Sequence, residues 1–325
     1  MHPILRTCVQ RLALGVVTLW VISVIVYGLV DMLPGNFAQA LLGQSATPEV
    51  VENFNKRAGL DRPIVERYAR WLAGAVQGDF GVTFTSLSNT GGAERTVASI
   101  ITPRLGNTLI LAAMVAIISV PLALTLGVLA ALYRNSLFDR IVNLTTLSSI
   151  SVPEFLVGYI LMLFLAVRNP WFFSLATVDQ GTPIGEHMAR IALPVLTLVL
   201  VIVAHMMRMT RAAIINLLNS AYIETAKLKG LPPARVIVHH ALPNAWAPIA
   251  NVIAVNLAYL VVGVVVVEVV FAYPGIGQLM VTAVQNRDIP VVQACAIIFA
   301  LAYILMNLLA DIAAIVTNPR LLHPR

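Results

Sequence analysis

Residues 107–132 read NTLILAAMVAIISVPLALTLGVLAAL, and no side chain in this stretch is charged. At about 1.5 Å per residue, a helix of this length exceeds the roughly 30 Å thickness of the hydrocarbon core of a bilayer. A helix on the surface of a soluble domain keeps one polar face, and this stretch has none. It therefore predicts a membrane-spanning helix.

Similar apolar runs recur along the chain. The composition agrees with them, because 59% of the residues are hydrophobic and only 11% are charged, which exceeds what a soluble core needs. The sequence therefore predicts an all-α membrane protein with six transmembrane helices. The runs lie at residues 12–31, 107–132, 142–167, 191–213, 244–271 and 290–316.

The positive charges predict how these spans are oriented. Six spans place both termini on one side, and short cytoplasmic segments are rich in Lys and Arg. The two short loops on the other side hold only Arg168, Arg190 and Arg287, and the loop at 32–106 is too long to count. Both termini are therefore predicted to be cytoplasmic. The cations on that side are Arg6, Arg11, Arg134, Arg140, Arg208, Arg211, Lys227, Lys229, Arg235, Arg320 and Arg325.

The spans divide the chain into four parts. Residues 1–31 form a cytoplasmic N-terminus and the first span, and residues 32–106 form an extracytoplasmic helical loop. Residues 107–316 form a core of five spans, and residues 317–325 form a cytoplasmic tail. Because the basic residues flank membrane spans, they predict topology and no nucleic-acid partner.

The N-terminus has a feature of secretory signal peptides. A charged start and an apolar run precede Ala38-Gln39-Ala40, which resembles a cleavage site for signal peptidase. The run is too long for an ordinary signal peptide, so a retained first span is favoured. Cys8 lies at the inner end of the first span and Cys295 lies inside the sixth, so both are expected to be free thiols.

The loop at 32–106 carries helix signals. Thr47-Pro48-Glu49 predicts a helix start and Gly59 its end. A second helix is expected from about Asp61-Arg62-Pro63 to Gly78-Asp79-Phe80-Gly81. The loop is either a platform for a soluble partner or a lid that packs on the outer ends of the spans. The apolar side chains at helical spacing are Ile64, Tyr68, Trp71, Leu72 and Ala75.

Residues 222–243, YIETAKLKGLPPARVIVHHALP, are unusually polar for this chain. They lack the apolar face of a buried helix, Gly230 can end a helix, and Pro232 and Pro233 enforce a break. The pattern predicts a short helix, a turn and a second helix that together project into the cytoplasm. Ala226 is small enough for close approach by another surface.

Two acidic residues inside predicted spans, Glu154 and Glu268, are candidates for a functional role, because a charge within the membrane costs on the order of 3 kcal/mol. Glu154 lies near the middle of the third span, after Pro153, and Ser151 and Gly158 are expected on the same helix face. This face lines the translocation cavity, or else Glu154 is protonated or paired internally with His205 or Arg208. Glu268 lies near the outer end of the fifth span, where solvation or gate packing is expected.

A sharp turn is expected just beyond the fifth span. Pro274, Gly275 and Gly277 mark this turn, which precedes a short helix at 278–285 and forms part of an outer gate. The sequence contains no phosphate-binding G-x-x-x-x-G-K-[ST] loop, G-x-S-x-G elbow, H-E-x-x-H pair or C-x-x-C motif. His239 and His240 are adjacent, so they point to different helix faces. The sequence therefore predicts no catalytic residue and no metal site.

Several motifs together resemble a known family. Glu224-Thr225-Ala226, followed by Gly230 and then Leu242-Pro243, resembles the EAA loop of permeases in binding-protein-dependent ABC importers. Thr225 replaces the usual alanine, and Asn318 stands where the family often has aspartate. Further matches extend over nearly the whole chain, and together they resemble the B-type permeases of oligopeptide, dipeptide and nickel importers. They are Gly59-Leu60-Asp61-Arg62-Pro63, Arg67-Tyr68, Trp71-Leu72, Gly78-Asp79-Phe80-Gly81, Val267-Glu268-Val269-Val270-Phe271, Pro274-Gly275-Ile276-Gly277, Asn307-Leu308-Leu309-Ala310-Asp311 and Asn318-Pro319-Arg320.

The resemblance implies a type I importer permease fold in the cytoplasmic membrane of a bacterium. It also implies a homologous second permease, two cytoplasmic ATPases and an extracytoplasmic substrate-binding protein as partners. This chain would bind no cofactor, and ATP and Mg would be used by the ATPases. The loop at 214–243 would couple the ATPases to transport through Tyr222, Glu224, Thr225, Ala226, Lys229, Gly230, Leu242 and Pro243.

The sequence leaves alternatives open for the class of solute and for the energy source. Peptides are the expected solutes, whereas nickel, glutathione, opines and oligosaccharides are carried by relatives of the same shape. A second hypothesis is an ion-coupled secondary transporter that uses Glu154 as its proton site. The EAA spacing argues against this hypothesis. A third, an intramembrane enzyme or scaffold, lacks a nucleophile and base at recognisable spacing.

Overall fold

The computed structural model describes residues 3–32, 37–88, 93–179, 181–232, 235–236 and 241–317. His239, His240, Asn318 and most of the predicted second helix of the 222–243 loop lie outside these ranges. Within them the chain is helical, apart from turns and a single antiparallel bridge between Val82 and Thr96. An all-α membrane protein was predicted, and this prediction is confirmed.

The described residues contain six membrane crossings when the broken third one is included. Five are single helices, and their centres agree with the predicted apolar runs. Both α6 and α9 extend well beyond the predicted limits, because helix propensity continues past the apolar residues. The five are α1 (Pro3–Asp31), α6 (Val97–Leu132), α9 (Ile184–Leu218), α12 (Leu242–Val270) and α14 (Ile289–Thr317).

The third crossing is broken into two helices. α7 (Leu137–Ser151) and α8 (Glu154–Met162), which continues as a π-helical segment over Leu163–Arg168, meet at an angle of 101°. Pro153 explains the break, because proline lacks an N–H and disfavours helical geometry in the preceding residue. Val152 is accordingly extended, at φ −101° and ψ 128°. The expected common face of Ser151, Glu154 and Gly158 is therefore wrong: Ser151 belongs to α7 and the other two to α8.

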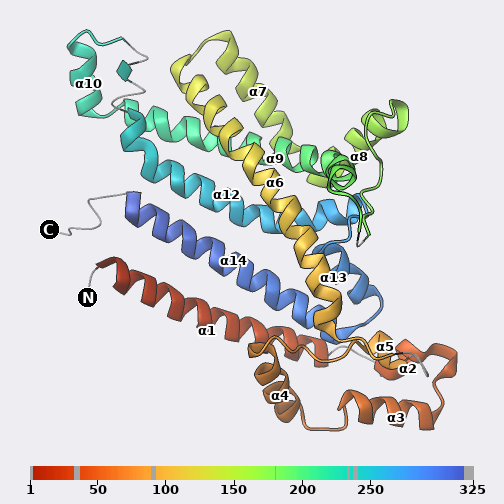
Figure 1. Ribbon diagram of the computed structural model, residues 1–325. Coiled ribbons are helices and arrows are strands. Elements are labelled where there is room, and N and C mark those ends of the chain that lie inside the picture. Colours follow the sequence, from red (N-terminus) through yellow and green to blue (C-terminus); the bar gives the residue numbers. More distant parts are fainter. Residues whose placement is uncertain are drawn as a thin grey trace. The chain divides into compact units, whose positions relative to one another are not determined.

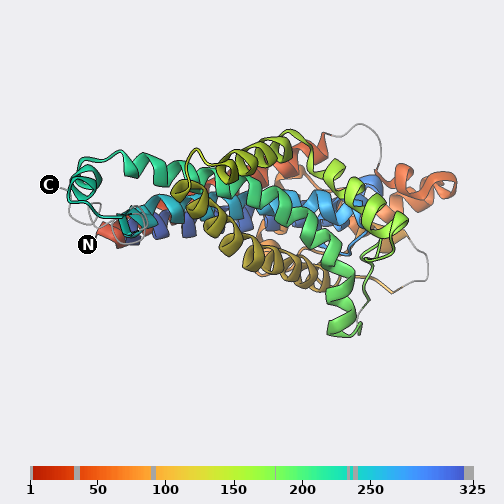
Figure 2. The ribbon, with the colours of Figure 1, turned by 90° about the horizontal axis from the view of Figure 1, so that it is seen from above.

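The chain forms two compact units. The first comprises Met1–Leu14, Ile110–Tyr273 and Ala302–Arg325, and the second comprises Gly15–Leu109 and Pro274–Leu301. In the first unit α9 and α12 run side by side, with α7 and α8 also against α9 (Figures 1 and 2). The middle of α9 is apolar, as expected of a helix surrounded by others, and most of its membrane window is buried.

Small residues allow close helix crossings in this first unit. A Cβ at Gly127 of α6 would lie 2.9 Å from Thr210 of α9, and one at Gly158 would lie 3.3 Å from Phe271. Glycine at such points lets backbones approach, which is the usual basis of helix association in membranes. At one end of the unit, Arg11 of α1 lies 3.2 Å from Asp311 of α14. Figures 1 and 2 place the short helix α10 (Ala221–Leu228) at this same end.

The second unit contains the predicted helices of the 32–106 loop. α3 (Pro48–Ala58) begins after Thr47, whose hydroxyl accepts from the N–H of Val50, and ends at Gly59 with φ +67°. Both predicted caps are confirmed. α2 (Phe37–Leu42) and α5 (Phe84–Ser88) pack against α3 around Phe54 and Phe84.

α4 (Ile64–Val76) packs against the last turns of α1. The hydroxyl groups of Tyr68 and Ser23 lie 2.7 Å apart, and the ring of Tyr27 contacts those of Tyr68 and Trp71. The face predicted from Tyr68 and Trp71 is therefore the one that meets a span, which supports the lid hypothesis for this helix.

Two sets of hydrogen bonds hold the segment that follows the fifth span within the second unit. The Asn107 side chain donates to the carbonyl of Pro274 at 2.9 Å, and Thr108 accepts from the N–H of Ile276 at 2.9 Å. Further along, the buried carboxylate of Asp288 accepts from the backbone N–H groups of Phe84 and Thr85. The predicted short helix is present as α13 (Ile276–Gln285), so Pro274 and Gly275 lie in the turn and Gly277 is buried in the first turn of α13.

Candidate functional site

Helix α10 carries most of the residues proposed for the coupling loop, and its two faces differ. Tyr222, Thr225 and Leu228, at helical spacing, are exposed, and Leu228 is 84% exposed. Glu224 and Lys229 are exposed as well. The outward surface is thus polar around two large hydrophobic side chains, Tyr222 and Leu228.

The inward face of α10 closes a small apolar core. Ile223 and Ala226 are buried in one cluster with Val236 and Ala241, and Leu218 and Leu231 pack against it. The expectation that this helix lacks an apolar face, and that Ala226 meets another surface, is therefore wrong. The small Ala226 side chain serves close packing inside the loop, which makes the projection a compact body.

The end of α10 is a Schellman motif. Gly230 has φ +74°, and the N–H of Leu231 bonds to the carbonyl of Ala226 at 3.4 Å. Leu231 packs on the cluster that contains Ala226, which is the apolar contact that usually accompanies this motif. A Cβ added at Gly230 would meet no atom within 4 Å, so glycine is needed there for its backbone angle and not for space.

Leu242 and Pro243 lie in the first turn of α12. Proline suits this position, because its missing N–H would have no helical partner there. The loop therefore connects directly to α9 through Asn219 and Ser220 and to α12 through Ala241. A force on α10 acts on two helices that pack along each other in the first unit.

Glu154 begins α8, and its carboxylate lies against the backbone of α12. A Cβ at Gly263 would be 3.0 Å from Oε2 of Glu154, so only glycine leaves room for this side chain. Among the described residues, no ion pair joins Glu154 to His205 or Arg208, and the His205 ring lies beside Tyr259 instead. The internal pairing considered from the sequence is thus not present.

Glu268 is fully buried, with 0% exposure, among the core residues of the first unit. Of the two roles expected for it, solvation is therefore wrong, because the side chain is packed inside the protein. Tyr273 lies nearby, since its N–H bonds to the carbonyl of Glu268, and its hydroxyl is 3.0 Å from Nε2 of His187. Burial, reinforced by the Glu268 charge, raises the pKa of the Tyr273 phenol, which keeps its proton.

Two features were not identified in the sequence. Leu228 is the most exposed apolar side chain on α10. Its neighbours at helical spacing, Glu224 and Thr225, are polar, and this could have indicated that Leu228 lies on the exposed face. The ion pair between the buried Asp139 and the partly buried Arg211 joins α7 to α9. It had no such signal, because the two residues are distant in sequence.

Comparison with known proteins gives matches over nearly the whole chain. Residues 123–323 match the family described as binding-protein-dependent transport system inner membrane component, and residues 4–112 match the N-terminal segment of such components. A probable peptide ABC transporter permease of Sinorhizobium fredii is 33% identical over 317 residues, covering 96% of this chain and 97% of that protein.

The glutathione transport system permease protein GsiC of Escherichia coli strain K12 is 35% identical over 315 residues, covering 97% of this chain and 98% of that protein. The likeness extends over the spans, the segment between the first two spans and the α10 loop. The chain therefore belongs to the family of binding-protein-dependent transport system inner membrane components, and it is a multi-pass permease of a type I ABC importer.

Proposed function

We propose that this permease translocates peptide-class solutes in an ATP-driven complex. Its partners would be a homologous second permease, two cytoplasmic ATPases that bind the α10 loop, and a substrate-binding protein that delivers the solute. The peptide and glutathione permeases that resemble it support this solute class. The chain would bind no cofactor itself, and ATP and Mg would act on the ATPases.

The exposed face of α10 is the observation that carries this proposal. Large apolar side chains on a projecting polar helix mark a protein interface, because water solvates them poorly. Tyr222 and Leu228 are such side chains. α10 also lies at the end of the first unit where Arg11 and Asp311 meet, as expected if this end faces the cytoplasm.

The compact core of the loop supports a coupling role. When ATP binding closes the ATPases, a rigid projection seated between them would transfer that movement to α9 and α12. Ser220 strengthens the connection, because its carbonyl accepts from the N–H groups of Ile223 and Glu224 and its hydroxyl donates to Leu217. Residues of the pathway would then alternate between inward-open and outward-open arrangements.

Replacement of Leu228 by aspartate is expected to remove ATPase subunits from the purified complex. A charge placed in the centre of an apolar contact loses at least about 2 kcal/mol, or roughly 30-fold in affinity. The measurement is the ratio of ATPase to permease after affinity purification of tagged chain with its co-expressed neighbouring genes. Leu228→Met keeps an apolar side chain and should retain the ATPases. Equal retention by Leu228→Asp would contradict the proposed docking face.

The alternative, a proton-coupled carrier, depends on Glu154. We expect Glu154→Gln to leave uptake within about twofold of wild type, or about 0.4 kcal/mol, since ATP supplies the energy. Uptake is measured in proteoliposomes with ATP inside and an imposed pH gradient as the comparison. Glu186→Gln, which loses only an exposed partner of Arg190, is the matched control. Uptake that needs the gradient and Glu154 but no ATP would establish the carrier instead.

A further inference from the structure

A cavity of about 540 Å³ lies in the second unit between α1, α3, α4, α5 and the start of α14. Among its described lining residues, five side chains are basic and two, Asp79 and Glu94, are acidic. The floor is apolar and aromatic. The basic side chains are Lys56, Arg57, Arg62, Arg67 and Arg70, and the floor includes Tyr27, Trp71, Phe80, Phe84, Leu87 and Pro290.

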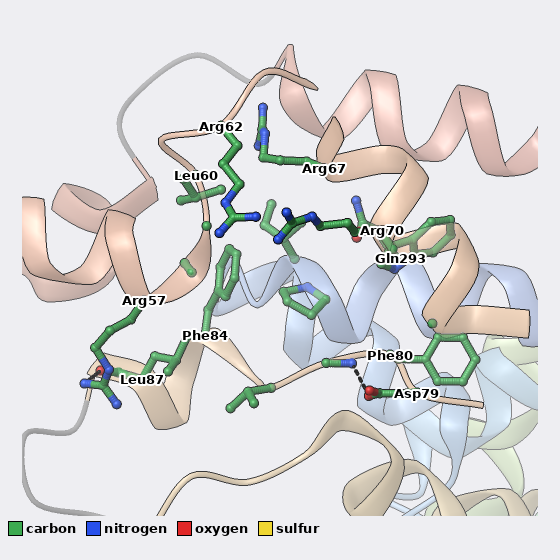
Figure 3. Close-up of a pocket in the computed structure, with 18 of the residues that line it drawn as sticks. Arg57, Leu60, Arg62, Arg67, Arg70, Asp79, Phe80, Phe84, Leu87 and Gln293 are labelled. Carbon is green, nitrogen blue, oxygen red and sulfur yellow. Dashed lines mark hydrogen bonds between the residues drawn. The ribbon is translucent and has the colours of Figure 1, made fainter. Parts of the chain in front are cut away.

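Carboxylates beside the cavity pair with its basic side chains: Lys56 lies 2.6 Å from Glu52, and Arg57 lies 2.7 Å from Glu94. Arg62 and Arg70 share one carboxylate, Glu66, at 3.3 and 2.8 Å, so two guanidinium groups meet a single negative charge. Figure 3 shows Arg62, Arg67 and Arg70 gathered on one side of the cavity, with Phe84 below them. Like charges held together repel unless an anion joins them. Guanidinium groups bind phosphate in a bidentate manner, which makes it a matching ligand.

The depth of the cavity relative to the membrane identifies the source of the phosphate. Tyr27 lines the cavity and lies two residues before the end of the first apolar span at Leu29. Tyr68 and Trp71 of α4 pack on this last turn of α1. Tyrosine and tryptophan collect where the hydrocarbon meets the headgroups. The arginines of α4 therefore lie at the level of phospholipid headgroups.

Exposed apolar side chains lie on α1 and α4, the two helices of the cavity that face this depth of the membrane. Trp20 and Val24 are exposed and share a face of α1 with Tyr27. On α4, Val65 is 75% exposed and Val76 is 81% exposed, as on helices that lie in the membrane interface. A small soluble anion has no apolar part that could cover these side chains.

We propose that this cavity binds the phosphate headgroup of an anionic phospholipid, with the acyl chains against the exposed face of α1. The lipid would fasten α4 to α1 at the outer surface. The indole N–H of Trp71 is buried and has no hydrogen-bond partner among the described residues, so it provides one more donor beside the arginines.

The test uses the detergent-purified complex, titrated with dioleoyl phosphatidylglycerol and observed by native mass spectrometry. Arg62→Gln with Arg70→Gln should weaken lipid retention about tenfold for each lost charge-assisted bond. Both side chains are partly exposed, at 41% and 64%, so the fold should persist, which an unchanged thermal midpoint checks. The control is Arg168→Gln with Arg287→Gln, two exposed arginines outside the cavity that should leave retention unchanged.

Three results would overturn the proposal. Equal lipid retention by the cavity variant and wild type would exclude these arginines as the headgroup site. Equal loss in the control variant would indicate unspecific charge attraction. Displacement of the lipid by glycerol 3-phosphate at matched concentration would indicate a site for a free phosphate compound, since a lipid held by its acyl chains resists such a competitor.

Discussion

Replacement of Gly230 by proline is expected to abolish solute uptake while the assembled complex still hydrolyses ATP. Gly230 has φ +74°, and the proline ring fixes φ near −65°. Proline also disfavours helical geometry at Lys229, the last residue before the turn. The Schellman turn that folds Leu231 back onto Ala226 therefore cannot form, which costs on the order of 3 kcal/mol or about 150-fold.

The experiment compares uptake and ATP hydrolysis in the same proteoliposomes. Gly230→Asn is the matched control, because asparagine tolerates left-handed backbone and nothing lies within 4 Å of the added Cβ. The control should keep most of the uptake. Wild-type uptake by Gly230→Pro would mean that the shape of the turn is not needed for coupling, and the proposed role of the α10 loop would fail.

Loss of Arg211 is expected to cause the largest drop in stability. Its Nε and Nη2 donate to the two carboxylate oxygens of Asp139 at 2.7 and 2.8 Å. Asp139 is buried and also accepts from Asn143 and from the N–H of Asn135. Arg211→Leu leaves a buried carboxylate without its cation, and such losses cost about 3–5 kcal/mol.

The thermal midpoint of the purified chain in detergent measures this loss. Arg211→Leu should lower it by on the order of 10 °C. Arg208→Leu, an exposed arginine one turn away on α9, should change it little. The double variant Asp139→Leu with Arg211→Leu should recover part of the loss, because no buried charge remains. An equal drop in the thermal midpoint for both variants would show that the ion pair with Asp139 does not contribute to stability beyond the loss of any arginine.

The sequence by itself determined the features that depend on neighbouring residues. A membrane span needs only a long apolar run, so all six crossings were predictable. Helix ends depend on a few adjacent groups, and so Thr47, Gly59 and Gly230 fall at caps in the structure. Pro153 indicated a kink or a helix start for the same local reason, although the bend of 101° exceeds what it implied.

Only the tertiary structure decided which faces meet. The inward position of Ala226, the burial of Glu268 and the joining of Asp139 to Arg211 each depend on a partner from another segment. In a chain this apolar, periodicity separates the faces of a helix poorly, because lipid-facing and protein-facing residues are equally hydrophobic. Charged and small residues at the crossings carry the information that distinguishes them, and their partners become known only when the helices are packed together.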